Sequence, residues 1–143
     1  MFKTRMVLIA SMTLLSLAPQ PFAKTAEKPC TKQEAMQAEE EADHLDNWNA
    51  VYQSFKRFSH CDDGGIAEGY SDAVGKLLAD HWNQFPDLVK LATSDQRFQS
   101  FVVRHIDETI PADTLKKTAQ NAKSRCPGNA AGLCKLIARA ASH

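Results

Sequence analysis

Apolar residues recur at intervals of three and four positions along most of this chain, which is the spacing of one face of an α-helix. One such stripe begins at Ala38 and ends at Phe58. Between them it includes Ala42, Leu45, Trp48, Val51, Tyr52 and Phe55. No segment alternates apolar and polar residues for long enough to indicate a strand. The pattern therefore predicts an all-α protein, with the aromatic residues of this stripe in its core.

Glycine and proline divide the rest of the chain into shorter helices. Gly64-Gly65 ends the first stripe, and later breaks stand at Pro86, Pro111 and Pro127. We expect a pair of helices over 66–82 and 86–94, a second pair over 95–109 and 112–125, and a last helix carrying Leu133, Cys134, Ile137 and Ala141. The pairs could stack as helical hairpins or form an irregular bundle, because no repeated sequence favours one arrangement. The prediction is a compact bundle of about six or seven short helices.

The first 23 residues have the layout of a secretory signal peptide. Lys3 and Arg5 precede an apolar run over 6–17, and Ala23 is a small residue suited to cleavage. The run is shorter than the roughly 20 residues that span a bilayer. We therefore expect cleavage near Ala23, a periplasmic single helical domain over 24–143, and no membrane span.

The charge balance argues against a nucleic-acid partner. The leader contains two basic and no acidic residues, so 24–143 carries 15 basic and 17 acidic residues, a net charge near −2. Nucleic-acid-binding domains normally show a basic stripe instead.

The four cysteines all lie in the mature part, which in an exported chain predicts two disulfides. One straight helix between Cys30 and Cys61 would be about 45 Å long, whereas bridged Cα atoms lie within about 7 Å. Pairing therefore requires a break, best placed within 44–49, where Asp46 or Asn47 can cap a new helix. The preferred pairing is Cys30–Cys61 and Cys126–Cys134. A zinc site is not expected, because no closely spaced C-x2-C pair occurs.

The most unusual polar segment is His60-Cys61-Asp62-Asp63-Gly64-Gly65, with Glu68 close behind. Acidic residues beside glycines can form a calcium loop, but the ligand spacing of such a loop is missing here. The alternative is a helix-capping turn in which Asp62 or Asp63 accepts a backbone hydrogen bond. We favour the capping turn and keep His60, Asp62, Asp63 and Glu68 as the candidate functional turn.

His105 stands beside Asp107 and Glu108, and a histidine near carboxylates can act as a general base or a metal ligand. It also falls on the apolar stripe that contains Phe98 and Phe101. We therefore favour a histidine at the edge of the core whose ring nitrogen bonds a nearby acceptor. No G-x-S-x-G, phosphate-binding loop or H-E-x-x-H motif occurs. We expect no catalytic residue, no metal and no cofactor.

Glu39-Glu40-Glu41 and Asp43 form the densest acidic run of the chain. Such a run is usually a solvated helix face. In a binding protein it would speed association with a basic partner, so these four residues are the candidate binding face.

Three local patterns resemble a group of uncharacterised small exported all-helical proteins of Gram-negative bacteria. They are Ala42-Asp43-His44-Leu45 followed by Trp48, His60-Cys61-Asp62-Asp63-Gly64, and Phe98-x-x-Phe101-Val102-x-x-His105-Ile106-Asp107. More loosely, the size, leader, helices and cysteine pairs are similar to periplasmic immunity proteins of contact-dependent secretion systems. That resemblance implies a protein that occludes a secreted effector, and it carries no site residues.

Our prediction is a periplasmic binding or inhibitory protein of the immunity type, as a monomer or a homodimer, and not an enzyme. Two alternatives stay open. One is a small periplasmic enzyme or metal-binding protein that uses the 60–65 turn and His105, whose side chains would then converge. The other is a structural protein of the envelope.

Overall fold

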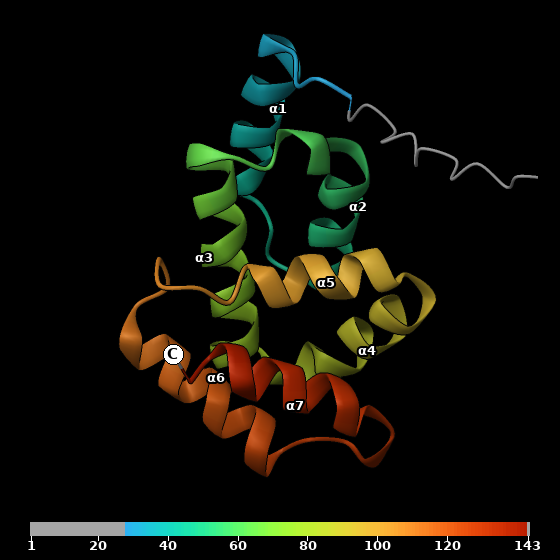
Figure 1. Ribbon diagram of the computed structural model, residues 1–143, viewed down its shortest axis with the longest axis vertical. Helices are drawn as coiled ribbons and strands as arrows, with labels where there is room; N and C mark the ends of the chain where they lie inside the picture. Colours follow the sequence, from blue (N-terminus) through green and yellow to red (C-terminus); the bar gives the residue numbers. More distant parts are fainter. Residues whose placement is uncertain (1–27, 143) are drawn as a thin grey trace, which may run out of the picture.

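The computed structural model describes residues 28–142, so the predicted signal peptide and its cleavage near Ala23 lie outside the described residues (Figure 1). The described part of the chain folds into seven α-helices and contains no strand. The helices are α1 (Lys32–Ala42), α2 (Trp48–Phe58), α3 (Gly64–Asp80), α4 (Phe85–Ser94), α5 (Gln96–Arg104), α6 (Ala112–Ser124) and α7 (Ala131–Ala140). Short 3-10 turns lie at Ser59–Cys61, Trp82–Gln84 and Gly128–Ala130. The all-α prediction is confirmed, and no helix within 28–142 is long and apolar enough to cross a membrane.

The predicted break in the first apolar stripe is confirmed. α1 ends at Ala42, and α2 begins after Asn47, whose side chain accepts a 3.0 Å hydrogen bond from the backbone N–H of Ala50. This cap satisfies one of the free amide groups at the start of α2. The break lets the chain turn back on itself, so that both ends of the α1–α2 pair lie close together.

Both predicted disulfides are present. Cys30–Cys61 joins the segment before α1 to the turn after α2, with Cα atoms 4.9 Å apart. Cys126–Cys134 closes the connection between α6 and α7, with Cα atoms 6.1 Å apart. Each bond therefore closes the ends of two consecutive helices.

The prediction of a helix over 95–109 was wrong at its C-terminal end, because α5 stops at Arg104. Asp107 accepts hydrogen bonds from the backbone N–H of Thr109, at 2.9 Å, and from its hydroxyl. An aspartate that bonds the amide two residues on stabilises a turn in competition with the helix. The residues after α5 therefore form a tight connection to α6 that begins with His105.

The helices form an irregular bundle, and not the stacked hairpins that the sequence left open. α3 runs through the molecule and packs against α1 at one end and α6 at the other, while α4 pairs with α5 and α6 with α7 (Figure 1). The predicted partners α3 and α4 share few contacts, as do α5 and α6. Some consecutive helices therefore pair, but not the predicted ones, and α3 packs against α1 and α6, neither of which adjoins it in the chain.

Aromatic side chains from α2, α3 and α5 make the centre of the core. Phe101 packs against Tyr70 edge-on, with ring centroids 4.9 Å apart, and against Phe55 at the same distance. Both Phe101 and Tyr70 are almost completely buried. This confirms the core position of the aromatic stripe, and it places α5 so that the residue after its last turn, His105, enters the interior.

Candidate functional site

The predicted functional turn divides into two parts. Asp63 stays at the surface and caps α3, where its carboxylate accepts a 2.8 Å hydrogen bond from the backbone N–H of Gly64. This is the capping role predicted for Asp62 or Asp63. Gly64 has φ +53°, a backbone conformation that glycine adopts without strain. Asp62 turns the other way, into the protein.

Asp62 meets His105 inside the molecule. Oδ2 of Asp62 lies 3.2 Å from Nε2 of His105 and also accepts a hydrogen bond from Arg104. The side chains of Asp62 and His105 are 7% and 4% exposed. The His105 ring lies against Phe101 with ring centroids 4.4 Å apart. The prediction of a core-edge histidine bonded to a side-chain acceptor is confirmed.

The other ring nitrogen of His105 continues the chain of contacts. Nδ1 lies 3.0 Å from Oγ of Ser71, and Ser71 donates a 2.8 Å hydrogen bond to Oδ2 of Asp107. Because the single hydroxyl hydrogen of Ser71 goes to Asp107, Ser71 must accept from Nδ1. The contact with Asp62 requires a hydrogen on Nε2 as well. The Asp62–His105–Ser71–Asp107 network is therefore complete when His105 carries hydrogen on both ring nitrogens.

The electrostatics of the network favour charged carboxylates. Burial raises the pKa of Asp62, but hydrogen bonds and charge from His105 and Arg104 outweigh it and lower the pKa below 3.8. Burial likewise raises the pKa of Asp107, and the hydrogen bonds from Thr109 and Ser71 outweigh that effect, so the pKa is lowered.

The network resembles a set of nucleophile, base and orienting acid, but its geometry turns the serine inward. Ser71 is 1% exposed, and its hydroxyl is engaged by Asp107. A nucleophile must reach the substrate carbonyl carbon directly. The adjoining cavity, about 200 Å³, is lined by Asp62 and Ser71 with the exposed Glu68 also on its wall. The hydrogen bonds of the network hold the turn before α3, and α3 itself, against the end of α5.

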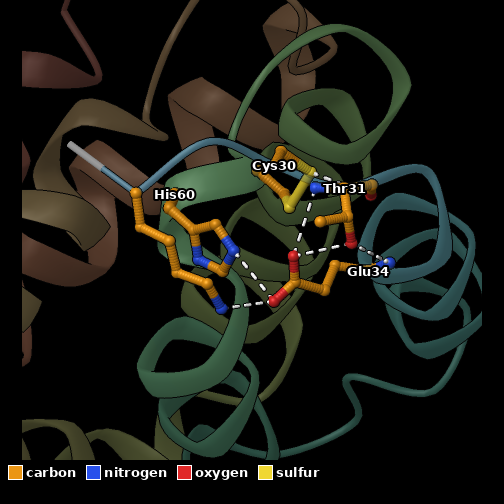
Figure 2. The surroundings of a disulfide bond; sticks show 6 residues. Cys30, Thr31, Glu34 and His60 are labelled. Atoms are coloured by element: carbon orange, nitrogen blue, oxygen red, sulfur yellow. Dashed lines mark hydrogen bonds and ion pairs between the residues drawn. A yellow bond between two sulfur atoms is a disulfide. The ribbon is translucent and has the colours of Figure 1, made fainter.

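His60 does not join Asp62 and His105. It faces Glu34 of α1 beside the Cys30–Cys61 bond, with Nε2 of His60 3.3 Å from Oε1 of Glu34 (Figure 2). Apart from this ion-pair contact, the buried Nε2 atom has no hydrogen-bond partner within the described residues. Glu34 also pairs with Lys28.

Glu34 was missed by the sequence reasoning, although a local signal was present. Thr31-x-x-Glu34 is a capping box: Oγ1 of Thr31 accepts from the backbone N–H of Glu34, and the Glu34 carboxylate accepts from the backbone N–H of Thr31 at 3.1 Å. The hydrogen bond from Lys28 and those from Thr31 lower the pKa of Glu34 to about 2. The box fixes this carboxylate beside the disulfide.

The candidate binding face lies along α1. Glu39, Glu40 and Asp43 are exposed, whereas Glu41 is half-buried and pairs with Arg57 of α2. Met36, on the same helix, is 60% exposed. Three of the four predicted residues therefore face solvent.

No protein-family model, no curated protein and no solved structure matches this chain.

Proposed function

We propose that this is an exported protein that binds another protein and blocks it, as an immunity protein blocks a secreted effector. The observation that carries the proposal is the outer surface of α1, where Glu39 and Glu40 lie exposed on the same helix as Met36 and the exposed Asp43 follows at its C-terminus. Interfaces combine such apolar anchors, methionine among them, with a polar rim. We propose that the partner is a secreted effector with a basic surface, because opposite charge speeds association and selects the partner.

α1 is held firmly enough to act as a preformed surface. Its N-terminus is secured by the capping box and by the Cys30–Cys61 bond. Along its length Ala38 is buried, and Glu41 pairs with Arg57 of α2. A surface that is already ordered loses little conformational entropy on binding. This favours recognition by α1 without rearrangement.

The polar network supports the same proposal in a different way. His105 and Ser71 are buried and bonded to each other, so they contribute to the frame that holds α3 against the end of α5. We propose that this network has a structural role and not a catalytic one. The exposed acidic face is what remains available to a partner.

The test is a pull-down from periplasmic extract with the oxidised protein, followed by mass spectrometry and a binding titration with the purified partner. We expect a stoichiometric secreted effector such as a cell-wall hydrolase. Glu39→Gln with Glu40→Gln should weaken its binding at least about tenfold, mainly at low salt. The control, Glu108→Gln with Asp113→Asn, removes the same charge elsewhere and should leave affinity unchanged. Equal affinity of both variants, or no partner at low salt, would contradict the proposal.

A further inference from the structure

Four side chains with metal-ligating atoms meet where α1 begins (Figure 2). A carboxylate oxygen of Glu34, a ring nitrogen of His60 and Sγ of Cys61 all lie within 4.8 Å of one another. Sγ of Cys30 is bonded to Sγ of Cys61. We propose that Cys30, Cys61, His60 and Glu34 form a binding site for Zn²⁺ or a similar divalent ion when the Cys30–Cys61 bond is reduced.

The donor set matches the chemistry of zinc. Zn²⁺ is bound tetrahedrally by cysteine sulfur, histidine nitrogen and carboxylate oxygen at about 2.0–2.3 Å. Four such donors around one ion are about 3.3–3.8 Å apart, from the same bond lengths. In the present structure the ligand atoms of Glu34, His60 and Cys61 lie within 4.8 Å of one another, which is close to that range. Small side-chain rotations would bring these three donors to bonding distance, and Cys30 would supply the fourth from beside Cys61.

The redox state of the two sulfurs controls this site. In the disulfide, neither Cys30 nor Cys61 is a thiolate, the form that binds metals. A dithiol reductant transfers two electrons and two protons: its own sulfurs form a disulfide, and Cys30 and Cys61 become thiols. The ion then displaces the two thiol protons and forms two metal–sulfur bonds. Only His60 and Glu34 are available as ligands before that step.

Two features prepare the site for an ion. Nε2 of His60 is buried, faces the Glu34 carboxylate at 3.3 Å and lacks a hydrogen-bond partner in the described part of the chain. The capping box with Thr31 fixes the Glu34 carboxylate beside the disulfide. The Lys28 side chain, which now pairs with Glu34, is 64% exposed. It can move into solvent when an ion arrives.

The second disulfide provides an internal comparison. Among residues 28–142, the only group of three or more histidine, cysteine or acidic side chains close enough to share an ion is the one at Glu34, His60 and Cys61. Cys126 and Cys134 have no such neighbours within that part of the chain. Reduction alone therefore does not create the site, and His60 and Glu34 distinguish the two cysteine pairs.

The first experiment uses Co²⁺ as a coloured substitute for Zn²⁺, in a variant with Cys126→Ala and Cys134→Ala. After reduction and removal of the reductant, one Co²⁺ per chain should give the absorption of a tetrahedral thiolate site, and Zn²⁺ should displace it. The oxidised protein should give none. Glu34→Gln retains the capping box, which accepts glutamine. Glu34→Gln and His60→Gln should each weaken Co²⁺ binding at least about tenfold, whereas Glu39→Gln should not.

A redox titration gives an independent measurement. An ion that binds only the dithiol multiplies the equilibrium ratio of dithiol to disulfide. The factor is 1 + c/Kd, where c is the concentration of the free ion. At 100 times Kd the shift is about hundredfold. Circular dichroism shows whether the reduced chain keeps its helices with and without the ion. The proposal is overturned if the reduced protein gives no tetrahedral spectrum, if Glu34→Gln and His60→Gln bind like the parent, or if the ion leaves the ratio unchanged.

Discussion

Nε2 of His105 lies 3.2 Å from Oδ2 of Asp62, although the two residues are 43 positions apart in the chain. The contact joins the residue that follows α5 to the turn that precedes α3. That turn also carries Cys61, and through its disulfide it holds the start of α1. The Asp62–His105 contact therefore helps to fix both clusters of polar side chains.

Replacing Asp62 by asparagine tests the charge in this contact. The pKa of Asp62 is lower in the folded protein than its ordinary value of 3.8. The folded state therefore binds fewer protons, and the stability that Asp62 contributes is present above about pH 3.8 and is lost as the pH falls through the folded pKa. We expect Asp62→Asn to lower the free energy of unfolding by about 1–3 kcal/mol at pH 7. Urea unfolding at pH 7 and pH 3 should show a smaller deficit at pH 3, and an equal deficit would contradict the charged contact.

Ser71→Ala tests the buried end of the network. The change leaves Nδ1 of His105 without its partner in the interior, which we expect to cost about 1–3 kcal/mol of unfolding free energy. Ser100→Ala is the matched control, because Ser100 is exposed and bonds only the carbonyl of Gln96 within its own helix. Its effect should stay within about 0.5 kcal/mol. Similar losses in both variants would show that the Ser71 contacts contribute little.

The two disulfides should differ in their effect on stability. Cys30–Cys61 spans 31 residues and Cys126–Cys134 spans eight. Loop-closure entropy in the unfolded chain then predicts losses of about 3.7 and about 2.5 kcal/mol when each pair is replaced by alanine. Denaturant unfolding of the two double variants measures the difference. A larger loss for Cys126 and Cys134 would indicate that native-state packing outweighs loop length.

Two helical glycines should respond to alanine with opposite signs. A Cβ on Gly69 of α3 would stand 2.7 Å from Cβ of Ala42, so Gly69→Ala must push α1 away. Overpacking of this kind costs about 1–3 kcal/mol. A Cβ on Gly132 of α7 meets nothing within 4 Å, and Gly132→Ala should stabilise the helix by up to about 1 kcal/mol. Thermal unfolding of both variants measures the two effects. An unchanged melting temperature for Gly69→Ala would contradict this account.

Local sequence signals predicted the elements well, because each depends on near neighbours. Asn47 caps α2 through a side chain and an amide three residues apart. The end of α5 was missed for a related reason. The apolar stripe continues to Ile106, which is buried, but Asp107 bonds Thr109 and ends the helix earlier. The run of buried apolar residues that starts in α5 therefore continues past the end of the helix.

The sequence by itself determined the helices and the break between α1 and α2, because periodicity and capping act over short distances, and it favoured the cysteine pairing that the structure has. Only the tertiary structure decided which polar residues meet. Asp62 reaches His105 and Ser71 because α5 packs beside α3, and His60 reaches Glu34 because the disulfide draws α1 onto the turn after α2. Such contacts join residues far apart in the chain. Their formation depends on how apolar faces pack, and no local pattern in the sequence records it.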